Sequence, residues 1–307
     1  MHQNIVVIIA TSMNRTSLLL KRSLPSVLRQ TCLPKAVIIV DDNCRYADQL
    51  HSDQFKIIQR GMTEVRKYEL CKRLKITSNK FSSVEPYIEV IPNSRTVGNS
   101  GTGAWNTGAM RALTFQDRNE PLYIAFLDDD DEWKDTYLER CYHAVKNRIN
   151  FSEIDTILGV FASFIRKTEC NKVLNHIDEC QLNPESFFIG NPGIQGSNIF
   201  IDIQTFWEIE GFDERFPSTT DRDFAIRLFD HLKTRQGNRL TTISDPLVIH
   251  HAHNDPRVTT DISKKHQGLD LFYEIYGYRM TKKVLEASLQ RAYNFFGYKK
   301  GYLYDYS

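Results

Sequence analysis

The sequence predicts an α/β protein with a mostly parallel central sheet flanked by helices and a helical carboxyl-terminal extension. Three runs carry this prediction, because residues 5–10, 36–40 and 123–127 are apolar throughout, as is typical of strands buried on both faces of a sheet. Parallel strands need crossover connections, and the intervening segments are long enough to supply them. A chain of 307 residues can bury one large core with an appendage.

The first half of the chain alternates predicted strands with predicted helices. Thr16 or Ser17 can cap the first helix, which carries Leu24 and Val27 on its apolar side. Three glycines within residues 98–103 allow close backbone approach to a ligand and precede another helix. The predicted elements are strand 5–10, the helix from Thr16 or Ser17, strand 36–40, helix 63–74, strand 87–91, the helix after the glycine-rich turn, and strand 123–127.

The second half of the chain is expected to complete the sheet and then become helical. Ser218, Thr219 and Thr220 precede an amphipathic run that begins with Asp221, and hydroxyl and acidic residues of this kind mark a helix amino terminus. From about Lys264 the chain is basic, rich in tyrosine and compatible with helix. The predicted elements are helix 133–147, strand 156–165, loop 190–198, strand 199–203, turn 211–216, the helix at Asp221 and strand 242–249.

Four consecutive aspartates, Asp128 to Asp131, follow directly after the apolar run 123–127. Ligands of open α/β sheets bind outside the carboxyl ends of the strands. So many carboxylates in one turn repel one another unless a positive charge neutralises them. A hard divalent cation binds carboxylate oxygens and leaves positions for phosphate oxygens, so the turn predicts a metal site. The alternative is an acidic turn that begins the next helix, since acidic residues are favoured there.

Aspartates also end the second apolar run, at Asp41 and Asp42. Because two predicted parallel strands end in aspartates, these residues are expected to share one site with the four-aspartate turn. The last predicted strand runs into His250, His251 and His253. Side chains alternate along an extended chain, so His251 and His253 are expected on one face and His250 on the other. Either residue of that pair could add one ligand to a metal already bound by Asp130.

The ordered landmarks of the chain resemble the family 2 glycosyltransferases, which have the GT-A fold and an inverting mechanism. The resemblance covers roughly residues 4–255 and depends on order and spacing rather than on one motif. The landmarks are IVVIIATSMNR, SLPSVLRQT, VIIVDDN, GTGAWNTG, YIAFLDDDDEW, the GFDERF turn, TDRDFAIRL and the late histidines.

This resemblance implies a role for individual residues of the first half. Thr11 matches the loop after the first strand that lines the nucleotide pocket, and Asp42, with Asp41 beside it, matches the aspartate that contacts the base. Within the family's D-x-D element, Asp130 would bind the metal, and Asp128 or Asp129 would reach the ribose or the waters of the metal. Asn106 would also contact the donor.

For the second half, the resemblance implies that Asp221 is the catalytic base and that His251 or His253 contacts the metal or the diphosphate. Asp223 is the main rival as base, and a helix-capping role for Asp221 remains open. The chain departs from the family at two positions. Trp105 replaces an arginine, which removes a cationic phosphate contact, and Thr220 replaces the glutamate that precedes the base.

The activity implied is metal-assisted transfer of a sugar, with inversion, from a nucleotide-diphosphate donor to a hydroxyl acceptor on a glycan or lipid-linked glycan. A UDP-sugar is the favoured donor and Mn²⁺ or Mg²⁺ the expected cofactor. The expected domains are 1–258, with a nucleotide-sugar half (1–132) and an acceptor half (133–258), and a helical extension, 259–307. The alternatives are an aspartate-nucleophile phosphohydrolase, a nucleotidyltransferase and a non-catalytic module that binds nucleotide sugars.

Bulk composition narrows the partners. The sequence has 39 basic and 38 acidic residues, which gives no electrostatic argument for nucleic acid as the main partner. Its six cysteines are scattered without a C-x-x-C pair, as expected for reduced thiols. No apolar segment approaches the roughly 20 residues that span a bilayer, and the amino terminus does not resemble a signal peptide. A cytoplasmic enzyme, soluble or peripheral at the inner face of the membrane, is therefore expected.

Overall fold

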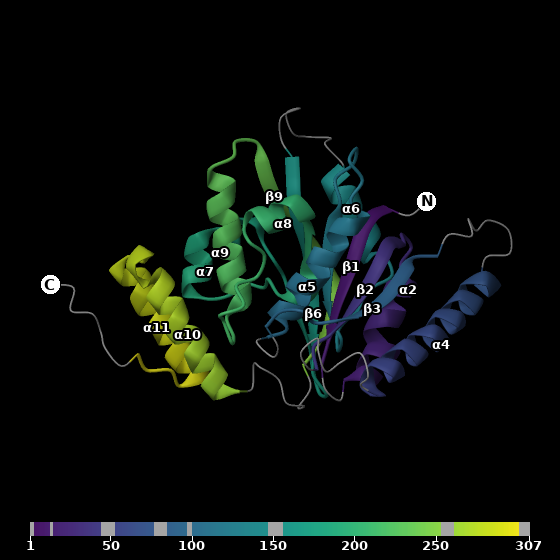
Figure 1. Ribbon diagram of the computed structural model, residues 1–307. Helices are drawn as coiled ribbons and strands as arrows, with labels where there is room; N and C mark the ends of the chain where they lie inside the picture. Colours follow the sequence, from purple (N-terminus) through teal and green to yellow (C-terminus); the bar gives the residue numbers. More distant parts are fainter. Residues whose placement is uncertain are drawn as a thin grey trace.

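The computed structural model describes residues 3–12, 15–43, 53–76, 85–96, 100–146, 156–252 and 261–300. These residues form one nine-stranded mixed sheet with helices on both faces (Figure 1). Its strand order is β3-β2-β1-β4-β8-β6-β9-β5, and β7 (Lys172–Asn175) pairs with β6 at the side. The predicted α/β class, with a mostly parallel central sheet flanked by helices and a helical carboxyl-terminal part, is confirmed.

The first four strands are parallel and end at the same edge of the sheet. They are β1 (Gln3–Thr11), β2 (Pro34–Asp41), β3 (Tyr87–Pro92) and β4 (Tyr123–Asp128). In the register of these strands, Thr11 lies opposite Asp41, and Ala10 lies opposite Asp128. The apolar runs of the sequence thus bring the polar residues that follow β1, β2 and β4 together at one edge.

The second half of the sheet folds back towards this edge. Strand β8 (Ile199–Asp202) is antiparallel to β4 and to β6 (Thr156–Lys167), and β9 (Asn238–His251) is parallel to β6. The far end of β9 pairs with the short strand β5 (Glu132–Trp133), directly after the four-aspartate turn. The pairing of β5 with β9 therefore returns the late histidines to the aspartates.

The helix predicted from Trp133 begins later, because β5 occupies this position. Trp133 pairs with Val248 of β9, and its indole Nε1 donates a hydrogen bond of 2.7 Å to the carbonyl oxygen of Ser197. Helix α6 then runs from Tyr137 to Lys146. The backbone hydrogen bonds of a two-residue edge strand thus replace the first turn of the expected helix.

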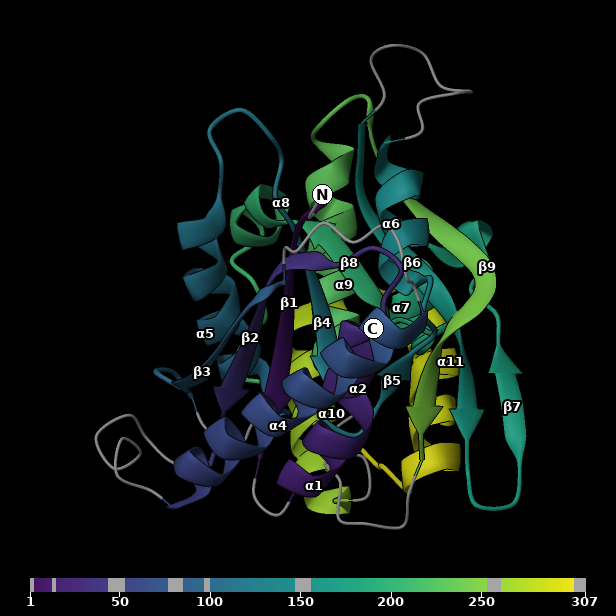
Figure 2. The same cartoon turned by 90° about the vertical axis from the view of Figure 1, so that its right-hand side faces the viewer.

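Helices cover the two faces of the sheet separately. On one face, shown in front in Figure 2, lie α1 (Thr16–Leu18), a π-helical turn (Leu19–Ser23), α2 (Leu24–Leu28), α4 (Asp53–Ile76) and α6. On the other face lie α5 (Thr102–Ala112), with a 3₁₀ turn at Leu113–Phe115, and α8 (Ile203–Glu208). Alternate residues of β1 belong to the two cores, which explains why its sequence is apolar throughout.

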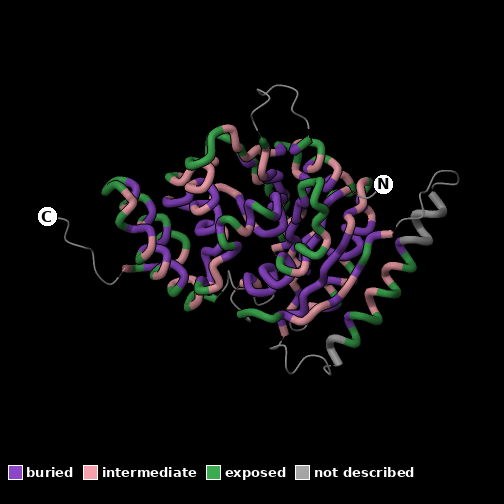
Figure 3. The backbone as a smooth tube through the Cα atoms, turned by 45° about the horizontal axis from the view of Figure 1, so that its top comes forward, coloured by how far each residue is buried: buried purple, intermediate pink, exposed green. Residues whose placement is uncertain are grey.

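The carboxyl-terminal helices share the core of the second face. Helix α10 (Ile262–Tyr276), a 3₁₀ turn (Gly277–Arg279) and α11 (Lys282–Phe296) lie beside α7 (Pro184–Ile189) and α9 (Thr220–Lys233) (Figure 1). Two 3₁₀ turns, Glu179–Gln181 and Gly196–Asn198, flank α7 in the chain. Buried residues run through the central strands and on into this helical layer (Figure 3). No helix of the described residues is long and apolar enough to cross a membrane.

Candidate active site

A cleft of ≈ 420 Å³ opens at the carboxyl edge of β1 and β4. The first half of the sheet supplies one wall, which contains Thr11, Asp42 and the aspartates after β4. The opposite wall comes from the second half, from the loop before α9, the end of β9 and α10. The residues on which the site depends are Thr11, Arg15, Asp42, Trp105, Asp128, Asp129, Asp130, Gln195, Asp221, His250 and Lys265.

The four aspartates after β4 point in different directions and have different partners. The carboxylate of Asp129 accepts hydrogen bonds from Thr11 Oγ1 and Arg15 Nη1, both at 3.0 Å. Burial raises the pKa of Asp129 to about 7, although the nearby guanidinium of Arg15 works against this rise. Asp129 therefore joins the loop after β1 to the acidic turn, and it lines the cleft together with Asp128 and Asp130.

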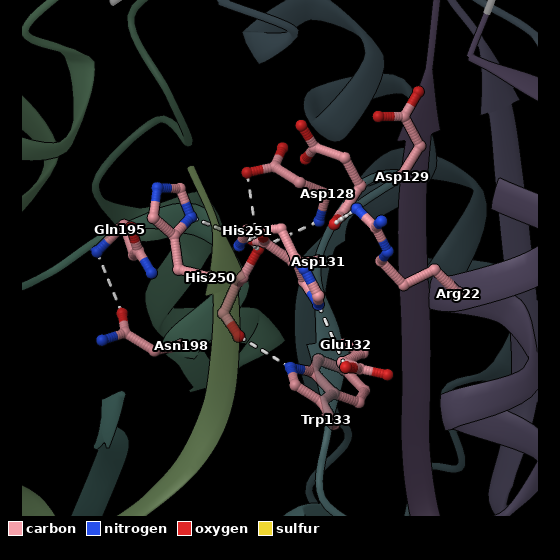
Figure 4. A network of polar contacts seen from close by, with 12 residues as sticks. Arg22, Asp128, Asp129, Asp131, Glu132, Trp133, Gln195, Asn198, His250 and His251 are labelled. Atoms are coloured by element: carbon pink, nitrogen blue, oxygen red, sulfur yellow. Dashed lines mark hydrogen bonds and ion pairs between the residues drawn. The ribbon is translucent and has the colours of Figure 1, made fainter. Parts of the chain in front are cut away.

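Asp131 anchors the acidic turn to the second half of the sheet (Figure 4). Its carboxylate lies 2.7 Å from Ser197 Oγ and 3.0 Å from His250 Nδ1, and it accepts a hydrogen bond from the backbone N–H of His251. Burial alone would raise the pKa of Asp131, but His250 and these hydrogen bonds lower it below its usual value. Asp131 is thus ionised and fixed in place by its contacts with Ser197, His250 and the backbone of His251.

Three of the four aspartates are arranged in a way that fits a hard divalent cation. Asp128, Asp130 and Asp131 each offer a carboxylate oxygen, and these oxygens lie within 4.8 Å of one another. Burial, and then the charges of its aspartate neighbours, raise the pKa of Asp128 well above its usual value. Arg15 already balances part of this charge, because its Nη2 lies 2.9 Å from Asp130 Oδ2. A set of oxygen ligands with excess negative charge suits Mg²⁺ or Mn²⁺.

Asp42 lies on the cleft wall as expected, at the end of β2. Its backbone N–H donates to the carbonyl oxygen of Thr11, and its Oδ1 accepts a hydrogen bond of 2.6 Å from Asn93 Nδ2. The neighbouring Asp41 is fully buried and does not line the cleft, and burial raises its pKa. Of this pair, Asp42 is therefore the residue that a ligand can reach.

Asn106, which the resemblance assigns to the donor, is placed in another position. Its Nδ2 donates to the carbonyl oxygen of Phe212 and to Glu214 Oε1, both at 2.8 Å, and its Oδ1 accepts from the Phe212 N–H. The side chain thus fastens α5 to the turn at residues 211–216, away from the residues that line the cleft. The preceding Trp105 does line the cleft and packs so close to Gly196 that a Cβ there would lie 1.9 Å from its ring.

Asp221 faces the acidic turn from the other wall of the cleft. It is the second residue of α9, whose N-cap position is Thr219 in the left-handed conformation at φ 71°, so Asp221 does not cap the helix. Its side chain is half-buried, and burial raises its pKa to about 6 against the opposing charges of Lys265 and His250. A carboxyl group of this kind is mostly ionised at neutral pH and still basic enough to accept a proton.

Asp223, the rival candidate for the base, is only 1% exposed and fully engaged. Its carboxylate lies 2.6 Å from both Arg227 Nη2 and the hydroxyl of Tyr276. Arg227 in turn donates to the carbonyl oxygens of Ile209 and Gly211. Asp223 therefore has a structural role: it joins α9 to α10 through Tyr276 and, through Arg227, to the turn that precedes α9.

The histidines separate by face as the alternation predicts. His250 lines the cleft and contacts Asp131, whereas the Nε2 of His251 lies 3.0 Å from Glu132 Oε1. The resemblance assigns a metal contact to His251, but the structure pairs the His251 side chain with Glu132, outside the cleft. His253, the other candidate, lies outside the described residues.

Several residues of the site could not be identified from sequence. Arg15 stood in the ATSMNR landmark without a role, and only the structure brings its guanidinium to Asp129 and Asp130. Ser197, from the predicted loop, contacts Asp131, and Lys265, from the expected extension, lines the cleft. Nothing local in the sequence signals either position. His250 was missed because the sequence favoured His251 and His253 as metal or diphosphate contacts and placed His250 on the opposite face of the strand.

Comparisons with known proteins identify the fold. No protein-family model matches the sequence, and no curated protein matches it. The structure of S. aureus TarS covers 96% of this chain with a TM-score of 0.52 at 13% identity, and the chain spans 44% of that protein. TarS 1-349 in complex with UDP-GlcNAc covers 96% with a TM-score of 0.56 at 14% identity, and the chain spans 73% of it. TarS 1-349 in complex with UDP gives a TM-score of 0.52 at 13% identity, over 96% of this chain and 72% of that one. The chain therefore has the GT-A fold that its sequence predicts.

Proposed function

We propose that the protein is a glycosyltransferase that moves a sugar from a nucleotide-diphosphate donor, with a UDP-sugar favoured, to a hydroxyl acceptor. One observation carries this proposal. A single cleft has a carboxylate cluster suited to a divalent cation on one wall and a half-buried carboxylate, Asp221, on the other. The complexes of the structural neighbour TarS with UDP and with UDP-GlcNAc support this kind of donor.

On the donor wall, Asp128 and Asp130, with Asp131 behind them, would hold Mn²⁺ or Mg²⁺. Bound there, the cation would stabilise the negative charge that develops on the departing diphosphate. Asp42 would accept a hydrogen bond from the nucleobase at the end of β2, and Arg15 would keep the acidic turn in shape through Asp129.

On the acceptor wall, Asp221 would take the proton of the acceptor hydroxyl as its oxygen attacks the anomeric carbon. Burial has brought the pKa of this carboxyl group to about 6, which suits a base at neutral pH. One carboxylate on the face opposite the leaving group is sufficient for a single displacement with inversion. The paired carboxylates of retaining glycosidases are not needed. A non-catalytic module would have no use for such a base.

The proposed division of labour follows the sheet. Residues 1–132 would bind the nucleotide sugar and 133–258 the acceptor, which we propose to be a glycan or lipid-linked glycan at the cytoplasmic face of a membrane. A UDP-sugar would enter against β1 and β2, because Thr11 and Asp42 lie there.

Calorimetry with UDP tests the donor wall directly. We expect binding in Mn²⁺ that is lost in EDTA, and weakened binding by Asp130→Asn in Mn²⁺. A screen of UDP-, GDP- and dTDP-sugars by thermal shift then identifies the base. Equal UDP affinity in Mn²⁺ and in EDTA would contradict the metal assignment, and no stabilisation by any nucleotide sugar would contradict the function.

A further inference from the structure

Lys265 belongs to α10, within the segment expected to be an extension, yet its side chain lines the cleft together with Asp221. The side chain is half-buried, and its ammonium lies over the ring of Phe296 at 4.7 Å. Among the described residues no carboxylate forms an ion pair with it. A half-buried cation without an ion pair is costly to place, so its position beside a carboxylate in a cleft indicates a function.

Helix α10 is docked firmly onto the loop that leads to Asp221. A Cβ on Gly268 would lie 2.2 Å from Ser218 Oγ and 2.7 Å from its carbonyl oxygen, so only glycine permits this approach. Ser218 Oγ also donates a hydrogen bond of 3.1 Å to the carbonyl oxygen of Lys264. The backbone next to Lys265 is therefore fixed to the backbone three residues before Asp221.

The charges around Asp221 come from several elements. Lys265 on α10 and His250 on β9 both favour its ionised form, and Lys265 is the stronger of the two. Arg222, its neighbour on α9, is committed elsewhere, because it donates to the carbonyl oxygens of Phe187 and Phe188. Across the cleft lie Arg15 and the aspartates of the acidic turn, of which Asp128, Asp129 and Asp130 line the same cavity.

We propose that Lys265 is a positioning residue of the catalytic cleft, whose ammonium shares the cleft with the Asp221 carboxylate and supplies the positive charge that balances it. This inference rests on the proposed role of Asp221 as base, and it makes the carboxyl-terminal helices part of the active site. Lys265 offsets the burial that disfavours the charged form of the carboxylate, and burial in turn keeps the carboxylate basic. The Asp223–Tyr276 hydrogen bond holds α10 in this position from its other end.

The test follows the Asp221 carboxyl group directly, without substrate. The full chain is labelled with ¹³C-aspartate, and the carboxyl resonance that is missing in Asp221→Asn is assigned to Asp221. An NMR pH titration of that resonance in the wild-type protein gives its titration midpoint. We expect Lys265→Met to move this midpoint to higher pH by on the order of one unit, because an opposite charge has been removed. Lys265→Arg, which keeps the charge, should restore it, and Lys283→Met on the exposed face of α11 should leave it unchanged.

The outcomes separate this inference from the proposed function. An unchanged midpoint in a folded Lys265→Met variant overturns the inference, even if nucleotide binding in Mn²⁺ is normal. A shifted midpoint with no nucleotide binding supports the electrostatic coupling and refutes the glycosyltransferase assignment instead. Once donor and acceptor are known, the acid limb of the kcat/KM profile should move up with the midpoint. A raised acceptor KM with an unmoved acid limb would assign Lys265 to acceptor binding and overturn the positioning role.

Discussion

Both walls of the cleft place carboxylates near a positive charge, but they assemble these groups differently. On the donor wall, Asp128 to Asp131 are consecutive, follow one buried strand and crowd their charges into a single turn. On the acceptor wall, Asp221 stands alone at the start of α9, and the nearby cation comes from a helix more than 40 residues further along the chain. The donor wall is thus built by local sequence, and the acceptor wall by tertiary packing.

The two walls also differ in what balances the negative charge of their carboxylates. Excess negative charge on the donor wall is met partly by Arg15 and is suited to a cation, so that wall should respond to metal. On the acceptor wall the opposing charge is built into the protein, so Asp221 should respond to pH and to mutation of α10.

The largest expected effect is that of Asp221→Asn on catalysis. The amide keeps the shape of the side chain but cannot take a proton, so transfer should fall by about 10² to 10⁴. Metal-dependent UDP binding and the melting temperature should change little, because Asp221 makes no capping hydrogen bond. A transfer assay, calorimetry and melting curves on one preparation measure all three, and near-normal turnover would place the base on another residue.

Asp223→Asn is the matched comparison two residues away. It breaks a charge pair with Arg227 in which the side chain of Asp223 is 2% exposed and that of Arg227 25%, so we expect a loss of about 3 kcal/mol of unfolding free energy. Chemical denaturation measures this loss. The chemical step should be affected much less than in Asp221→Asn. A stable Asp223→Asn variant with the greater loss of turnover would reverse the two assignments.

On the donor wall, Asp42→Ala should raise the donor KM more than it lowers kcat. Asp42 lines the cleft and Asn93 already binds one of its oxygens, which orients the carboxylate for a nucleobase N–H. Loss of one such hydrogen bond from a charged acceptor is worth about 2 kcal/mol. Steady-state kinetics over a donor series checks the prediction, and unchanged donor affinity would show that Asp42 only ends a strand.

The same contrast explains what the sequence could predict. Continuous apolar runs predict strands β1, β2 and β4, and aspartates stand at the ends of β2 and β4. Most of the donor wall could therefore be predicted from the sequence. Strand β5 could not, because two residues carry no periodicity and its pairing with β9 depends on how the sheet curls. That pairing also decides that His250 rather than His251 faces the cleft, which alternation alone could not tell. The place of Lys265 at the cleft could not be predicted either, because it depends on the docking of α10 on Ser218.

The smallest expected effect concerns Glu214, which joins the two walls behind the cleft. Its carboxylate accepts hydrogen bonds from Asn106 Nδ2 at 2.8 Å and from the Thr96 N–H at 3.0 Å, and it pairs with Arg95. Burial works to raise its pKa, but these partners lower it below the ordinary value of 4.5. A carboxyl group whose pKa is lower in the folded state stabilises the protein above its unfolded pKa, and that stabilisation disappears as the pH falls.

Glu214→Gln should therefore cost about 1 kcal/mol of unfolding free energy at pH 7, since a charge-assisted hydrogen bond becomes a neutral one. The difference from the wild-type protein should shrink towards zero as the pH falls through the folded pKa, which lies below 4.5, because the wild-type carboxyl group then also loses its charge. Urea unfolding at pH 7 and at a series of lower pH values follows this difference. Glu286→Gln, on the exposed side of α11, is the control that should show no difference at any pH of this series. A loss of unfolding free energy in Glu214→Gln that does not change with pH would mean that the side chain joins the two walls by shape alone, and that its charge contributes nothing to stability.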